Sequence, residues 1–137
     1  MSVPLHYVDL RAFSYGTEDD DRVERALREL LPEDAAIERA VSTGHHGDRI
    51  VVMSARVERA DQMRHVFDRL RQAALLEEIA ESIGDRVNEN NALFVHLDKQ
   101  VAYRGEVRLG TGISLRAKIE AYPATREKAL DNVRSLF

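Results

Sequence analysis

The stretch STGHHGDRI, residues 42–50, places two adjacent histidines between two glycines. Imidazole nitrogens can bind a transition metal, take part in acid–base catalysis, or donate hydrogen bonds to phosphate. A metal site is disfavoured here, because neighbouring side chains on an extended backbone point to opposite faces and the helical spacing HxxxH is absent. The remaining histidines, which add no ligand motif, are His6, His65 and His96. For His96, two positions before Asp98, we expect a hydrogen-bonded structural role.

The glycines of this stretch are typical of a tight turn. Gly44 and Gly47 suit backbone conformations with positive φ, so they account for a tight turn at this position. They do not account for the presence of two histidines within the turn. A hairpin tip is an exposed place from which His45, His46 and Arg49 can face a partner. The alternative is that one imidazole packs on the sheet and caps backbone groups.

A second candidate site is LDKQVAYRGEVRLG, residues 97–110. Basic side chains contact phosphates, a tyrosine stacks on an unpaired base, and an amide reads a base edge. The side chains with these properties are Lys99, Gln100, Tyr103, Arg104 and Arg108. The segment therefore predicts RNA contacts, and the alternative is an exposed loop and strand without a partner.

Charge is distributed unevenly around a net value of −4. Residues 17–38 contain nine acidic residues and three arginines, whereas residues 98–128 contain seven basic residues and four acidic ones. The net charge argues against a generally basic nucleic-acid coat protein, but the asymmetry is compatible with one basic face on an acidic body. From the basic segment we expect phosphate contacts by Lys118, Arg126 and Lys128. Solvated strand and helix faces are the alternative.

The composition excludes several classes of site. The absence of cysteine excludes disulfides, cysteine zinc sites and thiol nucleophiles. No apolar stretch approaches the ~20 residues of a membrane span. The N-terminus lacks the basic and apolar regions of a signal peptide, so we expect a cytoplasmic protein. No GxSxG, phosphate-binding glycine loop or spaced carboxylate motif occurs, and we expect no catalytic residue, no metal and no cofactor.

Hydrophobic spacing over residues 1–137 predicts a single α+β domain with a largely antiparallel sheet packed with helices. Predicted strands cover 5–14, 36–42, 50–58, 92–97, 106–109 and 113–122, with hairpins at the histidine turn and through Gly110 and Gly112. Predicted helices run from an N-cap at Thr17 to Pro32, from a cap at Asp61, over 75–87 with a break at Gly84, and from Pro123 and Thr125 onward.

Four ordered stretches resemble a known family: YGTEDDDRVERALRELLP, GHHGDRI, LDKQVAYRGEVRL and KIEAYPATREKAL. Together they extend from Tyr15 to Leu130 and resemble an archaeal family described as RNA-binding proteins or predicted exosome subunits. The resemblance implies RNA association, a link to RNA processing or degradation, and a fold similar to that of the large-subunit ribosomal protein that binds 5S rRNA. It implies no catalytic activity and assigns no individual RNA-binding residue.

We therefore expect a non-catalytic RNA-binding protein that acts with RNA-processing machinery such as the exosome. Its first contacts are the five side chains of residues 97–110, with the histidine turn and the later basic residues second. One alternative is a protein-interaction adaptor whose acidic first helix docks on a basic partner. A metal-dependent hydrolase that uses the histidine turn ranks below both.

Overall fold

A computed structural model describes residues 3–137. Their strands form one sheet, and its central strand, the first in the chain, pairs with a neighbour on each side. Five antiparallel strands follow the order β2-β3-β1-β5-β4. They are β1 (Leu5–Tyr15), β2 (Glu38–Thr43), β3 (Arg49–Val57), β4 (Ala92–Asp98) and β5 (Gly112–Ile119). The predicted single α+β domain with a largely antiparallel sheet is confirmed.

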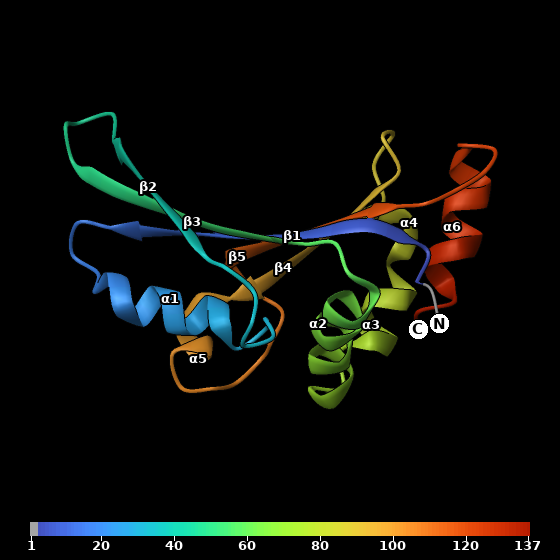
Figure 1. Cartoon of the computed structure of the whole chain (residues 1–137), viewed down its shortest axis with the longest axis horizontal. Helices are drawn as coiled ribbons and strands as arrows, with labels where there is room; N and C mark the ends of the chain where they lie inside the picture. The colour runs from blue at the N-terminus through green and yellow to red at the C-terminus, as the bar shows by residue number, and fades with distance from the viewer. Residues whose placement is uncertain (1–2) are drawn as a thin grey trace.

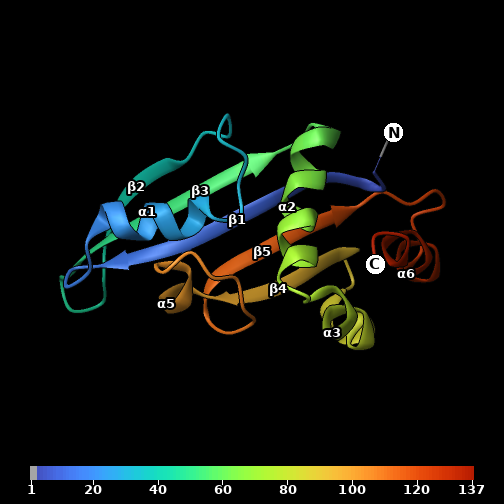
Figure 2. The same cartoon turned by 90° about the horizontal axis from the view of Figure 1, so that it is seen from below.

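Helices cover one face of this sheet. They are α1 (Asp20–Arg28), α2 (Ala60–Gln72), α3 (Leu76–Glu81), α4 (Ile83–Arg86), α5 (Lys99–Ala102) and α6 (Arg126–Arg134). Figure 1 shows α1, α2, α3 and α5 on the same side of the sheet, while α6 stands beside one end, near both termini. Figure 2 looks at the covered side, where α2 crosses the strands. The opposite face is open over its central strands (Figure 1).

Alternation along β1 explains which residues reach each face. Val8, Leu10 and Ala12 are completely buried against the helices. The predicted apolar stripe of the second helix is buried too, and consists of Met63, Val66, Phe67 and Leu70. Because successive side chains of a strand point to opposite faces, the odd-numbered residues from Tyr7 to Tyr15 lie on the open face. Within residues 3–137, no helix combines the length and apolar character that crossing a membrane requires.

The start of α1 differs from the prediction. Asp19, and not Thr17, is the N-cap, and its carboxylate accepts a hydrogen bond from the backbone N–H of Asp21 at 2.9 Å. Thr17 lies in the turn after β1, in which the N–H of Glu18 donates to the carbonyl of Tyr15 at 2.9 Å. The chain completes this turn before the helix begins.

Among the later helices, the start of α6 was predicted correctly and the cap of α2 was not. The N-cap position of α2 is Arg59, and Asp61 lies in the first turn, where its carboxylate accepts hydrogen bonds from the Arg59 guanidinium at 3.0 and 2.6 Å. Thr125 caps α6 and accepts from the N–H of Lys128 at 3.2 Å.

The predicted break at Gly84 falls two residues earlier. Gly84 lies inside α4, and the interruption is at Ser82, between α3 and α4. The Ser82 hydroxyl donates to the carbonyl oxygen of Glu78 at 3.1 Å. A serine that bonds to the preceding helical turn competes with the regular backbone pattern.

The predicted strand at 106–109 and its hairpin to the next strand are wrong. This segment lies along the free edge of β4, where the N–H of Gly110 donates to the carbonyl of His96 at 3.1 Å. Gly112 has a φ of +110°, and a Cβ there would lie 2.5 Å from the Cβ of Lys99. The glycine therefore allows a close passage against Lys99 before the chain enters β5.

Candidate functional site

Lys99 and Tyr103, two of the predicted RNA contacts, bind inside the fold. Lys99 is 7% exposed, and its ammonium donates to the carbonyl of Phe13 at 2.9 Å and to Glu18 Oε1 at 2.8 Å. The Tyr103 hydroxyl donates to Glu18 Oε2 at 2.6 Å. These polar atoms join the segment after β4 to the segment after β1.

The pKa values of this cluster reflect the same contacts. Burial acts to raise the pKa of Glu18, but the hydrogen bonds from Lys99 and Tyr103 outweigh it and hold that pKa below its usual value. Burial, followed by the hydrogen bond to the Glu18 carboxylate, raises the pKa of Tyr103. The cluster therefore favours an ionised glutamate beside a neutral tyrosine.

The other predicted contacts of this segment are exposed on the covered side of the molecule. Gln100, Arg104 and Arg108 are exposed, and Arg108 lies 3.8 Å from the carboxylate of Glu106. Figure 1 shows α5 and the orange segment after it on the same side of the sheet as α1. These side chains are accessible, but they are separated from the open face by the sheet.

The three later basic residues have different surroundings. The Lys118 ammonium donates to a backbone carbonyl in the turn before β4. The Arg126 guanidinium donates to the carbonyl oxygens of Val87 at 2.7 Å and Gly84 at 2.6 Å, which fastens α6 to α4. Lys128 is exposed. Of the three, Arg126 has the clearest structural role.

The histidine turn is exposed at a hairpin tip, as predicted. His45 and His46 are both exposed, and their rings meet edge to face with centroids 5.1 Å apart. The expectation that they point to opposite faces is wrong, because both lie in the turn and not in an extended strand. Gly47 has the expected positive φ of +82°, whereas Gly44 does not.

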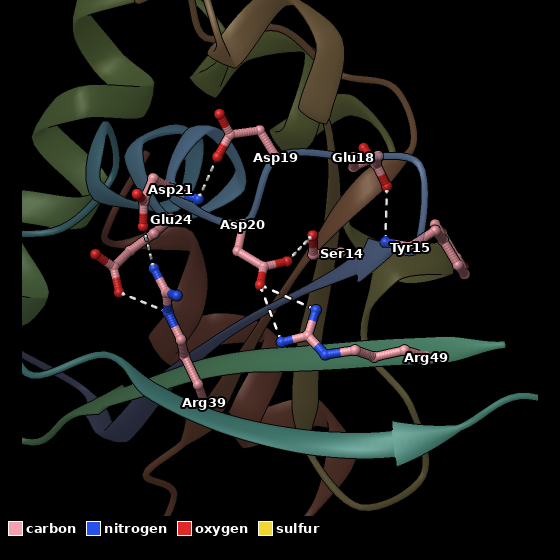
Figure 3. A network of polar contacts seen from close by, with 9 residues as sticks. All are labelled: Ser14, Tyr15, Glu18, Asp19, Asp20, Asp21, Glu24, Arg39 and Arg49. Carbon is pink, nitrogen blue, oxygen red and sulfur yellow. Dashed lines mark hydrogen bonds and ion pairs between the residues drawn. The ribbon is translucent and has the colours of Figure 1, made fainter.

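Arginines from β2 and β3 pair with the acidic first helix (Figure 3). Arg39 donates to Asp21 at 2.9 Å and to Glu24 at 3.3 Å. Both terminal nitrogens of Arg49 donate to the same carboxylate oxygen of Asp20 at 3.2 Å. Three carboxylates of α1 are thus engaged within the chain, which weakens the case for a basic partner docking there.

Aromatic side chains that the sequence analysis did not select lie on the open face of the sheet. Phe13 and Tyr15 are 38% and 50% exposed. Phe94 belongs to the same face, because its backbone is in register with Arg116 of β5. His96, two residues further along β4, is exposed there and does not have the buried environment of a structural histidine. Exposed rings on an open sheet are suited to stacking on flat ligands.

Two arginines of the open face form no ion pair within residues 3–137, although one of them, Arg116, lies over the Tyr7 ring at 6.0 Å from its centroid. Arg56 is paired, because its Nε and Nη2 donate to the Asp9 carboxylate at 2.7 and 2.9 Å. Within residues 3–137, by contrast, neither Arg11 nor Arg116 has an ion-pair or hydrogen-bond partner. The Nε of Arg116 is buried and has no hydrogen-bond acceptor among the described residues, which is an unfavourable arrangement for a polar group.

A hollow of about 310 Å³, named here the Ser114 hollow, lies among these groups. Its lining consists of Arg11, Phe13, Phe94, His96, Ser114 and Arg116, with Asp9 at one side. Arg11, Ser114 and His96 occupy one row across β1, β5 and β4. The small serine between two long side chains forms the floor of the hollow.

Both ends of the open face are raised. In Figure 1 the tip of the β2–β3 hairpin rises on the side opposite the helices, and so does the yellow turn before β4. The histidine turn therefore stands at one end of the open face. Rings, unpaired guanidinium groups and a raised rim together suit a ligand with both flat and anionic parts, such as a nucleic acid.

Among the described residues, 3–137, no group of three or more His, Asp or Glu side chains could hold a metal ion. The two imidazoles of the histidine turn gain no third ligand from the fold. The absence of a bound metal stays a prediction.

Comparison with known proteins identifies the chain. The family model described as RNA binding matches residues 7–119. The chain belongs to this RNA-binding family. The RNA-binding protein PAB1135 of Pyrococcus abyssi is 31% identical to it, with 94% of this chain and 91% of that protein covered.

Solved structures agree with this assignment. Mth689 of Methanothermobacter thermautotrophicus, a DUF54 protein, is 37% identical and superposes with a TM-score of 0.79, covering 96% of this chain and 97% of its own. AF2318 of Archaeglobus fulgidus, also assigned to DUF54, is 29% identical with a TM-score of 0.86, covering 97% and 99%. The RNA-binding family therefore shares this α+β fold along nearly the whole chain.

In this member of the RNA-binding family, sequence reasoning missed the open face. One signal was present in the sequence, since Tyr7, Phe13 and Tyr15 share the polar face of an alternating strand. Large rings on that face have no core to enter. The proximity of Arg116 and Phe94 had no comparable signal, because it depends on the register of β4 with β5.

Proposed function

We propose that this chain is a non-catalytic RNA-binding protein that holds RNA on the open face of its sheet. The observation that carries the proposal is the combination of exposed rings with two arginines, Arg11 and Arg116, that form no ion pair within residues 3–137. The Arg116 guanidinium does lie over the Tyr7 ring, 6.0 Å from its centroid. Phosphates bind cations that a fold leaves available, and bases stack on exposed rings.

Contacts beyond the centre of the open face are ranked by accessibility. His45 and His46 at the raised hairpin tip form a second group, whereas the Arg49 guanidinium bonds to Asp20 of α1 on the covered side. The more distant candidates are Gln100, Arg104, Arg108 and Lys128. Lys118 lies on the open face in register with Tyr7, but its ammonium donates to the carbonyl of Asn90. Lys99, Tyr103, Lys118 and Arg126 are left out of the proposed surface, because their polar atoms bind within the chain.

The biological setting is a further part of the proposal. The resemblance of the four sequence stretches to predicted exosome subunits supports a place in RNA processing or degradation, in the cytoplasm and beside other RNA-processing proteins. The lack of a nucleophile motif supports a binding role in which a partner performs the chemistry.

The test is the salt dependence of RNA affinity. For single-stranded RNA, each neutralised phosphate contributes about −0.7 to the slope of log K against log salt. Arg11→Ala and Arg116→Ala should each flatten the slope by about 0.7 and weaken binding. Arg25→Ala is the matched control, since Arg25 is exposed on α1 on the covered side of the sheet.

Two outcomes would contradict the proposal. If Arg104→Ala and Arg108→Ala flatten the slope while Arg11→Ala and Arg116→Ala do not, RNA binds on the covered side instead. If no salt-dependent RNA binding is found, the adaptor alternative gains support.

A further inference from the structure

The Ser114 hollow has a shape that a flat ring can enter. A strand rises about 3.4 Å per residue, so Phe94 and His96, which are two residues apart on β4, project from points about 7 Å apart. Stacked bases are separated by about 3.4 Å. One base placed between the two side chains would therefore lie at stacking distance from both.

The floor and the opposite wall complete the site. Ser114 stands between Arg11 and His96 in the same row, and its short side chain leaves room above the sheet. Phe13 contributes a further exposed ring from β1. Arg11 and Arg116 bring two unpaired guanidinium groups to the rim, where the phosphates flanking an inserted base would lie.

We propose that the Ser114 hollow is a base-stacking subsite, and that it makes the protein select RNA with unpaired bases over duplex RNA. The inference rests on the proposed RNA-binding function and adds the class of substrate. A base in a duplex is covered on both faces by its neighbours, so it cannot stack on Phe94 or His96 without leaving the helix. An unpaired base meets no such barrier.

A second hollow on the open face provides an internal comparison. It lies on the other side of Arg11, has Ser54 in its lining, and is bordered by the paired Asp9 and Arg56. Ser54 and Ser114 both lie directly opposite Arg11, on β3 and β5. The hollow at Ser54 is lined by no aromatic side chain, so it offers a base no stacking partner.

The experiment compares Ser114→Leu with Ser54→Leu. The probes are a short single-stranded oligoadenylate and the same strand annealed to oligouridylate, with one adenine replaced by fluorescent 2-aminopurine. Wild type should prefer the single strand, and binding should quench the probe. Ser114→Leu should weaken single-strand binding by about 5-fold to 150-fold, the range expected for one stacked base, and should abolish the quenching. Duplex affinity should not change.

Ser54→Leu should retain the preference and the quenching. Phe94→Leu, which keeps an apolar side chain but removes the ring, should reproduce the effect of Ser114→Leu if the latter variant folds poorly. None of the three leucine variants should flatten the salt slope, because none of them removes a charge.

The outcomes separate this inference from the function on which it rests. If Ser114→Leu and Phe94→Leu keep the single-strand preference while Arg11→Ala still flattens the slope, RNA binds the open face but the stacking subsite is refuted. Equal effects of Ser54→Leu and Ser114→Leu would also refute a specific subsite. If neither RNA binds with salt-dependent affinity, both proposals fail and a protein partner becomes the occupant to test.

Discussion

Lys99→Ala is expected to destabilise the protein without removing an RNA contact. The substitution deletes a buried ammonium that bonds to the Phe13 carbonyl and to the Glu18 carboxylate. Glu18 would keep its bond from Tyr103 but lose its neutralising charge. The variant thus separates a structural lysine from a phosphate-binding one.

The magnitude follows from the surroundings of the pair. Removing one partner of a buried ion pair costs about 3–5 kcal/mol. The Lys99 side chain is 9% exposed and that of Glu18 is 20% exposed, so water partly compensates the remaining carboxylate. We expect a loss near the lower end, about 3 kcal/mol of unfolding free energy, which corresponds to a decrease in Tm of roughly 10 °C.

Urea and thermal unfolding followed by circular dichroism would measure this loss, with the exposed Lys128→Ala as the control. The double variant Lys99→Met with Glu18→Gln removes both charges and should be less destabilised than the sum of its single changes. Salt titrations with the folded Lys99→Ala protein should keep the wild-type slope. A variant with wild-type stability and a slope flattened by about 0.7 would refute the structural role and restore Lys99 as a phosphate contact.

Three further predictions concern stability. The pKa of Glu18 is lowered in the folded protein, so the ionised carboxylate stabilises the fold fully above its ordinary pKa of 4.5. This stabilisation is lost as pH falls through the lower folded pKa. The stability difference between wild type and Glu18→Gln, measured by thermal unfolding, should therefore shrink on acidification below pH 4.5. Arg126→Ala should lower the unfolding free energy by about 1–2 kcal/mol in urea titrations because two backbone carbonyls lose a charged donor, whereas Lys128→Ala should not. Gly112→Ala should lower the unfolding free energy by more than about 1 kcal/mol, because Gly112 has a φ of +110° and its added Cβ would contact Lys99. Gly84→Ala should be neutral or stabilising, because Gly84 lies in a helix with open space around it. Equal effects of the two variants on unfolding free energy would contradict the close passage at Gly112.

Local periodicity determined much of the fold. The alternation of Val8, Leu10 and Ala12 with polar neighbours predicts one buried face of β1, and that face is completely buried. The helical spacing from Met63 to Leu70 likewise predicts the buried stripe of α2. These predictions succeed because burial of a regular element depends on a repeat of two or 3.6 residues within a single segment.

Segments without such a repeat were predicted less well. Residues 106–109 have the composition of a strand, but their one bridge is to the edge of β4, and no local pattern selects that neighbour. At Ser82 and Asp19, one of several suitable side chains bonds to the backbone. Local hydrogen bonds of similar strength compete there, so the sequence alone does not select among them.

Chemical roles depended most on tertiary structure. The basic segment after β4 has the residue types of an RNA contact, but folding brings Glu18, 81 residues away, against Lys99 and neutralises it inside the protein. In the Ser114 hollow, by contrast, folding assembles a candidate site that the sequence did not indicate. The strand order β3-β1-β5-β4 and its register bring Arg11, Phe94 and Arg116 together from three strands. The sequence determined which side chains alternate on each strand. Only the packing of the helices decided which face stays open, because a sheet buries the face that its helices cover and leaves the other exposed.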